Sequence, residues 1–480
     1  MASLVSDSTK TMGSPTESIS KTNQNDTKKS SHQVNSITYF KSFKDWWDSP
    51  RQLIIDTKTD NSVEKFKQST HNNKLIEYDL FKSILNEDIY IIPPGQTHES
   101  KSNKIGQLLD IELDDGTVIH EFYLQNRQKL ESEIHIVIIH GYMAALGYFI
   151  KNIEELLLPG VHLHLIDLPG FGNSMRPKFP KEFLDEPEST QDKIRQISNI
   201  ENWFIDRIEN WRIIRKLERF KLIAHSMGAY LSCCYLMKYN KGKDIVKEFV
   251  IVSPMGTESS ESSLITHPKY QNFHEKIDPF EELHFEEEEE GEDVYINEEL
   301  TYLWSSLGKP KFPKNLILSK LWQYHKSPFE ILQKTGPVYS KILSYWSFQR
   351  FKNFSGSGDT IDLILKLHDY SYSIFNQFQG SGELAITKLI SSEILAKLPL
   401  ADRGFIDYIV NEETKVLWIY GEHDWMNSKG GEYIHKKINE RSKLSSFEIV
   451  EKAGHHIYLD NSTKFNQLIL NFFNLNNQMD

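Results

Sequence analysis

The feature that most constrains this chain is a serine set between small residues where a strand pattern gives way to a helix pattern. Ser226 lies in the run Ala224-His225-Ser226-Met227-Gly228, after the apolar run Phe220–Ile223. A strand, a sharp turn that carries serine, and a helix form a nucleophile elbow, whose tight turn requires small residues two positions before and after the serine. Ala224 replaces the usual glycine but is still small. Ser226 is therefore the candidate nucleophile.

Candidates for the other two catalytic groups follow in the order that an elbow serine requires. Such a serine needs a base to accept its proton and a carboxylate to orient that base. In folds with this elbow the chain order is serine, acid, histidine. Asp424 follows the apolar run Val416–Tyr420, and His455 follows a glycine after the last apolar run. We predict Asp424 as the acid and His455 as the base, with Glu422 and His456 as the alternatives.

Two backbone N–H groups are candidates for binding the negative oxygen that forms during acyl transfer. Such an oxyanion needs two fixed donors. The first is expected to be Met227, directly after the nucleophile. The second is expected on the loop after the run Ile134–Ile139, which reads His140-Gly141-Tyr142. We predict Tyr142 as that donor.

Short apolar runs alternate with segments of helical pattern from about residue 106 onward. Continuous Val, Ile and Leu runs are typical of strands buried on both faces of a parallel sheet, and their alternation with helices predicts a doubly wound α/β sheet. Together with the elbow, this pattern predicts the α/β-hydrolase fold, a mostly parallel central sheet flanked by helices, with an inserted helical lid. The expected strands are Gln107–Leu113 and Thr117–Leu124, which form a hairpin, and Ile134–Ile139, Val161–Ile166, Phe220–Ile223, Phe249–Val252, Val416–Tyr420 and Phe447–Val450.

Changes in composition divide the chain into five segments. The start of the chain is rich in Ser, Thr, Asn and Lys and is predicted to be disordered. The alternation of strands and helices breaks after Met255 and resumes at Lys415, which indicates an insertion that covers the site. The predicted segments are 1–35, a disordered tail; 36–105, a helical segment; 106–254, the first part of the core; 255–399, a lid with an acidic loop at 281–293; and 400–480, the second part of the core.

Charge and cysteine content exclude several classes of protein. The net charge is -12, and nine of the negative charges lie in the run Glu281–Asp293, so the rest of the chain is close to neutral. Nucleic-acid binding needs clustered cations, which this balance does not favour. The two cysteines, Cys233 and Cys234, are adjacent, so they cannot form a disulfide framework and favour a reducing compartment. No metal-ligand spacing or dinucleotide fingerprint is found, so no cofactor is expected.

Two aromatic segments each leave two interpretations open. The segment around Trp46 and Trp47 has an apolar side that would suit a membrane surface, or would equally pack on the core. The lid aromatics would line a groove for acyl chains, although large apolar residues are more often interior. These lid residues are Trp304, Trp322, Tyr324, Phe329, Trp346, Phe348 and Phe351.

An ordered set of motifs resembles one branch of the α/β hydrolases. This branch includes the mammalian lipase co-activator of lipid droplets, its relative that hydrolyses N-acylated phospholipids, a fungal mitochondrial cardiolipin-specific deacylase and a fungal soluble lysophosphatidic acid acyltransferase. The resemblance covers about residues 37 to 475. It rests on His140-Gly141-Tyr142, Leu146–Phe149, Asp167–Ser174 with Arg176-Pro177, His225–Gly228, Val252–Pro254, Tyr420–Met426 and His455–Asp460.

The resemblance implies acyl chemistry on phospholipids. It implies a deacylase that uses water or an acyltransferase that uses acyl-CoA, with a non-catalytic adaptor at a lipid droplet or membrane as the other alternative. Trp46-Trp47 is similar to a lipid-anchoring segment of the branch. His455 and Asp460 match an H-x4-D element to which acyltransferase activity has been attributed. We expect a cytoplasmic protein with peripheral membrane contact, and the alternative is peripheral attachment to the mitochondrial inner membrane.

Overall fold

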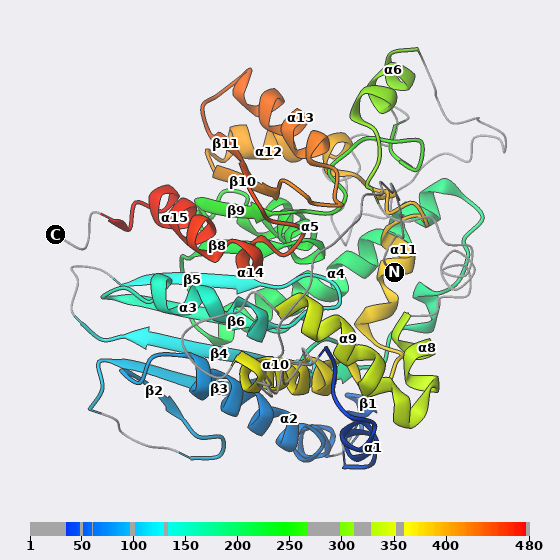
Figure 1. Ribbon diagram of the computed structural model, residues 1–480. Coiled ribbons are helices and arrows are strands. Elements are labelled where there is room, and N and C mark those ends of the chain that lie inside the picture. Colours follow the sequence, from blue (N-terminus) through cyan, green and yellow to red (C-terminus); the bar gives the residue numbers. More distant parts are fainter. Residues whose placement is uncertain are drawn as a thin grey trace, which may run out of the picture. The chain divides into compact units, whose positions relative to one another are not determined.

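The apolar runs of the sequence form the strands of one mixed sheet (Figure 1). The computed structural model describes residues 35–48, 51–59, 61–96, 101–128, 133–266, 298–311, 328–351 and 360–476. Chain contacts group residues Asn35–Asp480 into one unit, to which all the described residues belong. The predicted tail up to residue 34 and the acidic loop 281–293 lie outside the described residues.

Among the described residues the main sheet has nine strands, in the spatial order β11-β10-β9-β8-β5-β6-β4-β3-β2. A separate pair joins β1 to β7 in parallel. The strands are β1 (Ile54–Ile55), β2 (Ile89–Ile92), β3 (Lys104–Glu112), β4 (Val118–Asn126), β5 (Ile134–Ile139), β6 (Val161–Ile166), β7 (Arg176–Pro177), β8 (Lys221–His225), β9 (Glu248–Val252), β10 (Lys415–Gly421) and β11 (Ser445–Val450).

The strands agree closely with those expected from the sequence. The runs Ile134–Ile139 and Val161–Ile166 are β5 and β6 to the residue, and the predicted hairpin is the antiparallel pair β3 and β4. β4 also runs antiparallel to β6, whereas β5, β6, β8, β9, β10 and β11 are mutually parallel. The carboxyl ends of these parallel strands therefore meet at one edge, which we call the carboxyl edge of the sheet.

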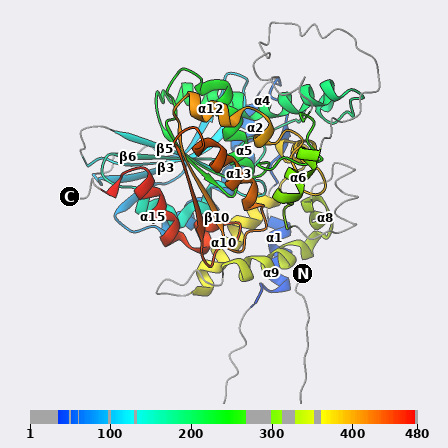
Figure 2. The same ribbon diagram turned by 90° about the horizontal axis from the view of Figure 1, so that it is seen from above.

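Helices cover both faces of the sheet, so the parallel strands are buried on both sides, as their continuous apolar runs require. Figure 2 shows α4 and α12 on one side of the strands and α10 and α15 on the other. The first face is packed with α4 (Thr190–Ile214), α5 (Met227–Tyr235), α11 (Ile386–Leu389), α12 (Phe405–Asn411) and α13 (Ser428–Asn439). The second is packed with α2 (Ser62–Ile84), α3 (Ile150–Leu156), α9 (Tyr339–Phe351), α10 (Thr360–Phe375), α14 (Ile457–Asp460) and α15 (Ser462–Phe472).

The segment between β9 and β10 holds the predicted lid. Its described helices include α6 (Glu298–Leu307), α8 (Pro328–Lys334), α9 and α10. Phe348 and Phe351 belong to the hydrophobic core, with 6% and 1% of their surface exposed, so at these two positions the core interpretation holds. Trp346 is exposed, and Trp304 donates a hydrogen bond from Nε1 to Ser259 Oγ. Trp322, Tyr324 and the side chain of Phe329 lie outside the described residues.

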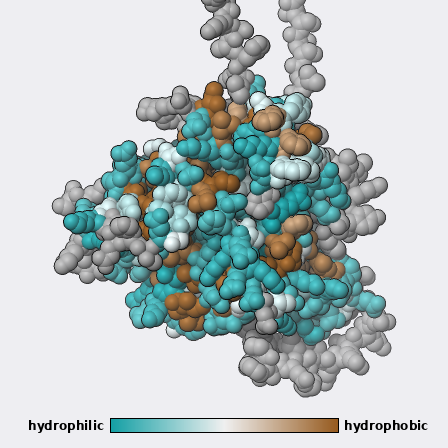
Figure 3. All heavy atoms as spheres, turned by 90° about the horizontal axis from the view of Figure 1, so that it is seen from below, coloured by the Kyte–Doolittle hydropathy of each residue, from teal (hydrophilic) through white to brown (hydrophobic). Residues whose placement is uncertain are grey.

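The segment around Trp46 and Trp47 forms α1 (Tyr39–Asp48), which packs against α9. Its aromatic side chains remain largely in solvent, with 79% of Phe40 and 72% of Trp47 exposed. Figure 3 views the molecule from below Figure 1 and shows apolar side chains in separate clusters on the surface that faces the viewer. We call the exposed aromatic residues of the two helices the aromatic face; they are Tyr39, Phe40, Phe43, Trp46 and Trp47 of α1 with Tyr345 and Trp346 of α9.

Candidate active site

Ser226 occupies the sharp turn between β8 and α5. Its φ of 55° lies in the left-handed region that side chains rarely adopt, as expected of an elbow. The backbone N–H of Ser226 donates to Val252 O on β9, which holds the strained turn in place. A Cβ atom at Gly228 would lie 2.2 Å from His140 O, so the position two residues after the serine must be glycine.

His455 joins Ser226 to Asp424. Its Nε2 lies 3.1 Å from Ser226 Oγ, and its Nδ1 lies 3.0 Å from Asp424 Oδ1. These contacts assign the roles in a neutral imidazole, in which Nδ1–H donates to the carboxylate and Nε2 accepts from the hydroxyl. The three side chains come from the carboxyl ends of β8, β10 and β11. The structure thus brings together the three residues that the sequence predicts.

Asp424 is held as a carboxylate. Its Oδ2 accepts a hydrogen bond from Ser253 Oγ, and its Oδ1 also accepts the backbone N–H of Met426 at 3.0 Å. Burial would raise the pKa of Asp424, but the hydrogen bonds and charge of His455 and the bond from Ser253 outweigh burial and hold the pKa below its ordinary value. An ionised Asp424 stabilises the imidazolium that forms when His455 takes a proton.

The two alternative residues point elsewhere. Glu422 is exposed, and its Oε2 accepts the backbone N–H of Lys452 at 2.9 Å. His456 is paired through Nδ1 with the hydroxyl of Tyr458 at 2.8 Å, and burial lowers its pKa well below the ordinary value. The geometry therefore favours Asp424 over Glu422 and His455 over His456.

The loop after β5 lies directly against the nucleophile. A Cβ atom at Gly141 would lie 2.7 Å from Ser226 Cβ, so only glycine allows this approach. His140 anchors the loop, because its Nε2 accepts the N–H of Leu168 at 3.0 Å and its Nδ1 donates to Gly141 O at 2.7 Å. Met227 is the first residue of α5, where backbone N–H groups lack a partner within the helix. Met227 directly follows Ser226, and Tyr142 directly follows Gly141, the glycine that lies against Ser226.

Three neighbours of the site were given no role from the sequence. Ser253 binds Asp424, His225 Nε2 donates to the backbone oxygen of His455 at 2.9 Å, and the ring of Trp425 lies 4.5 Å from that of His455. Each lies beside a recognisable motif residue, in the runs Val252–Pro254, His225–Gly228 and Tyr420–Met426. Their position beside a motif is the sequence feature that could have identified them. Their contacts with His455 and Asp424 are given only by the fold.

Asp460, the second residue of the H-x4-D element, contacts the loop that carries His455. Its Oδ2 accepts the backbone N–H of Gly454 at 2.9 Å, and its Oδ1 lies 2.6 Å from Arg350 Nη1 on α9. Arg350 also reaches the backbone oxygen of His456 at 3.4 Å. The Asp460 carboxylate thus fastens the loop to the lid helix, and both of its oxygens are engaged in doing so.

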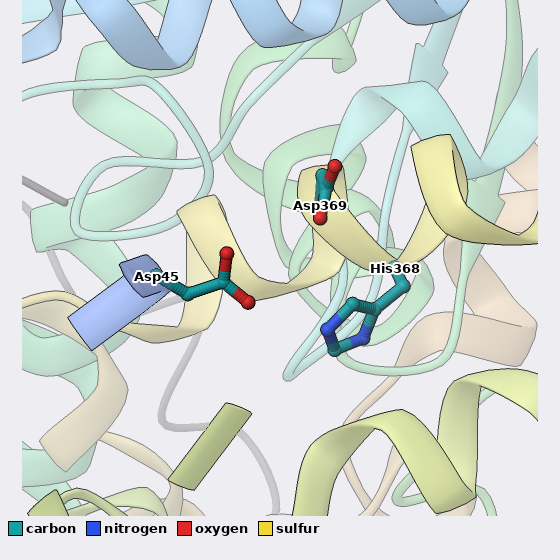
Figure 4. Close-up of side chains that lie close together, drawn as sticks. All are labelled: Asp45, His368 and Asp369. Carbon is teal, nitrogen blue, oxygen red and sulfur yellow. The ribbon is translucent and has the colours of Figure 1, made fainter. Parts of the chain in front are cut away.

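Figure 4 shows Asp45, His368 and Asp369, which form a cluster. Their ligand atoms lie within 4.8 Å of one another. Lys41 Nζ lies 3.1 Å from Asp45 and 2.7 Å from Asp369. Both ring nitrogens of His368 lie 3.1 Å from serine hydroxyls. The Lys41 ammonium already supplies positive charge to the two carboxylates, and we interpret the cluster as an ionic link between α1 and α10.

Comparison with known proteins places these elements in a family. Residues 134–462 match the family described as alpha/beta hydrolase fold, which is more than half of the chain. A solved carboxylesterase, CesB from Bacillus subtilis, is 14% identical and aligns with a TM-score of 0.42 over 84% of this chain and 98% of its own.

Several curated proteins are similar over most of this chain. Protein ECM18 of Saccharomyces cerevisiae is 26% identical over 74% of this chain and 74% of its own length. The 1-acylglycerol-3-phosphate O-acyltransferase ICT1 of the same yeast is 23% identical over 74% of this chain and 85% of its own. The human (lyso)-N-acylphosphatidylethanolamine lipase is 25% identical over 70% and 77%. These relatives match the branch that the sequence motifs resemble, and that expectation is confirmed.

Proposed function

Because this chain belongs to the α/β-hydrolase family, we propose that it is a serine enzyme that cleaves the acyl esters of phospholipids. The observation that carries the proposal is His455, whose two ring nitrogens lie 3.1 Å from the Ser226 hydroxyl and 3.0 Å from the Asp424 carboxylate. This arrangement converts a weakly nucleophilic hydroxyl into a strong one.

In the first half of the reaction Ser226 Oγ attacks the ester carbonyl while its proton passes to His455 Nε2. The N–H groups of Met227 and Tyr142 bind the oxyanion of the tetrahedral intermediate. His455 then returns the proton to the departing alcohol oxygen, and the acyl group remains on Ser226. Asp424 keeps the imidazole oriented and stabilises its positive charge.

In the second half an acceptor attacks the acyl-serine. His455 takes a proton from the acceptor, and Ser226 leaves with that proton. Water as acceptor releases a fatty acid, which is the deacylase reaction. A lysophosphatidic acid hydroxyl as acceptor forms phosphatidic acid. In that reaction acyl-CoA is the donor in the first half, and the departing group that takes the proton from His455 is the CoA thiolate. The second reaction is favoured by relatives named 1-acylglycerol-3-phosphate O-acyltransferase in yeast and in plants.

Peripheral contact with a membrane is part of the proposal. None of the described helices is long and apolar enough to cross a bilayer. The aromatic face exposes Phe40 and Trp47 to solvent, and Lys44 lies on the same helix. Aromatic rings beside lysines are suited to the headgroup region of a lipid surface. We expect the contact to be made from the cytoplasm, and cell fractionation distinguishes this location from the mitochondrion.

Purified protein and its Ser226→Ala variant, incubated with a mixed lipid extract with and without acyl-CoA, test the proposal. Mass spectrometry is expected to show lysophospholipid and fatty acid with the wild type, or phosphatidic acid when acyl-CoA and lysophosphatidic acid are both present. Ser226→Ala is expected to abolish either product. Equal lipid profiles for the two proteins would instead support a non-catalytic adaptor.

A further inference from the structure

One buried cation near the candidate active site takes no part in the proposed chemistry. Arg176 lies in β7, where it pairs with Ile54 of β1, and only 4% of its surface is exposed. Arginine is seldom buried to this degree unless its charge is paired. The position of Arg176 therefore requires an explanation beyond the pairing of two short strands.

Arg176 lines a pocket beside the oxyanion loop. The loop contributes Tyr142, Met143 and Ala144, which begin one residue after Gly141, the glycine that lies against Ser226. The empty space of the pocket, including the part open to solvent, is about 330 Å³. The other walls are Phe171 and Gly172 from the loop after β6, and Ile374, Phe375, Gln379 and Glu383 from the end of the lid.

The hydrogen-bonding capacity of Arg176 is only partly used. Its Nη1 donates to Gly170 O, whereas its buried Nε has no partner in the part of the chain that the structure describes. No carboxylate of the described residues forms an ion pair with it. Burial lowers the pKa of Arg176, but an ordinary value of 12.5 leaves it charged at neutral pH. The negative charges of Glu383 and Asp167 offset part of the cost of burying this cation, and a bound anion would offset more of it.

Glu383 is the acidic group in the same pocket, and its carboxylate is turned to its own loop. Its oxygens accept the backbone N–H groups of Gly380 and Ser381, the latter at 3.1 and 3.2 Å. These bonds satisfy the carboxylate without Arg176. Arg176 Nε is thus a donor at this pocket that has no partner among the described residues.

We propose that Arg176 binds the phosphate of the lipid substrate and so places the ester of a phosphate-bearing glycerolipid over Ser226. A guanidinium matches phosphate oxygens with parallel donors, which a neutral glyceride could not use. The inference rests on the proposed function and adds the class of substrate that the pocket selects. The phosphate of a lysophospholipid is the source we assign, rather than the phosphates of acyl-CoA.

Two substrates that differ only in the phosphate test the assignment. Oleoyl lysophosphatidic acid and monooleoylglycerol are compared by kcat and KM of deacylation, below their aggregation concentrations, for the wild type, Arg176→Gln and Arg176→Lys. Oleoyl-CoA hydrolysis forms a third arm. Arg207→Gln is the matched control, because Arg207 is also largely buried but pairs with Asp115 and stacks on Trp203.

Arg176→Gln is expected to raise KM for lysophosphatidic acid about 10- to 100-fold, the usual effect of a lost hydrogen bond to a charged group, and to change monooleoylglycerol turnover less than about threefold. Arg176→Lys is expected to recover part of the loss. The ratio of kcat/KM for the two substrates is measured on one sample, so partial misfolding does not change it. An equal loss on both substrates, or a loss on oleoyl-CoA alone, would overturn the assignment of Arg176. Absence of turnover by the wild type on every ester would instead overturn the proposed function.

Discussion

The carboxyl edge of the sheet and the aromatic face depart from the usual distribution of residues in opposite ways. At the edge, polar and ionisable side chains are buried: Ser226 is 6% and Asp424 8% exposed. On the aromatic face, large apolar rings of α1 and α9 lie in solvent. Buried polar groups and large exposed apolar patches are the informative exceptions to ordinary packing. The buried polar groups of the carboxyl edge are tolerated because each is hydrogen-bonded. The exposed rings of the aromatic face suit an apolar partner.

α9 connects the two regions. Near its start it packs on α1, and Lys341 Nζ lies over the rings of Tyr39 and Tyr345. At its end Arg350 binds Asp460 of α14, whose other oxygen accepts the N–H of Gly454 on the loop of His455. A substitution in one region can therefore be tested for its effect on the other region.

Replacing the nucleophile tests the carboxyl edge alone. Ser226→Ala is expected to lower kcat/KM about 10⁵-fold or more on both a soluble ester and lipid vesicles, because no other group attacks the carbonyl. Vesicle binding, measured by sedimentation, is expected to stay unchanged. Ser232→Ala is the control, since Ser232 is buried on α5 and its hydroxyl has no partner among the described residues. Residual activity near that of the wild type would contradict the assigned nucleophile.

Replacing the acid tests the orientation of the base. Asp424→Asn is expected to lower kcat about 10³- to 10⁴-fold, because the amide favours the wrong tautomer of His455. Glu422→Gln, which replaces the alternative acid, is expected to lower kcat less than about threefold. Since the pKa of Asp424 is held below its ordinary value, the carboxylate stays ionised above about pH 4. The wild-type pH profile is therefore expected to show no ionisation of Asp424 above about pH 4.

The link between the regions is tested at Asp460. Asp460→Asn and Arg350→Gln are each expected to lower kcat about 10-fold by loosening the His455 loop, and the double variant is expected to cost little more than either one. Hydrolysis and acyl transfer are expected to fall together. Loss of acyl transfer alone in Asp460→Asn would instead support a dedicated acyltransferase role for the H-x4-D element. Lys437→Gln breaks an exposed ion pair with Glu440 and is the control.

The aromatic face is expected to give the smallest effect. Phe40→Ala with Trp47→Ala is expected to weaken vesicle binding and vesicle activity about 3- to 10-fold, while turnover of a soluble ester stays unchanged. Tyr302→Ala is the matched control, because Tyr302 on α6 is 78% exposed but lies outside the aromatic face. Equal loss on the soluble ester would show that the two rings support the fold rather than lipid contact.

Much of the fold followed from local pattern. The sequence predicts both ends of β5 and β6 correctly, because a strand buried on both faces is a continuous run of apolar residues. The elbow at Ser226 and the loops with Asp424 and His455 were found for a similar reason, since a tight turn and a strand end restrict the residues beside them. The sequence does not decide the exposure of α1, because an apolar helix side has the same pattern whether it contacts a core or a lipid surface.

The sequence by itself predicted eight strands of the main sheet, the sharp serine turn and the chain order of the candidate triad, but not β1, β2 or β7. Each strand, turn and motif residue is recognised from neighbours within a few positions along the chain. Tertiary structure decided which polar groups meet: Ser253 with Asp424, Arg350 with Asp460, and Arg176 with the pocket beside Tyr142. These partners are separated by 171, 110 and 34 positions. Hydrogen bonds between side chains brought together by sheet order leave no periodic trace along the chain.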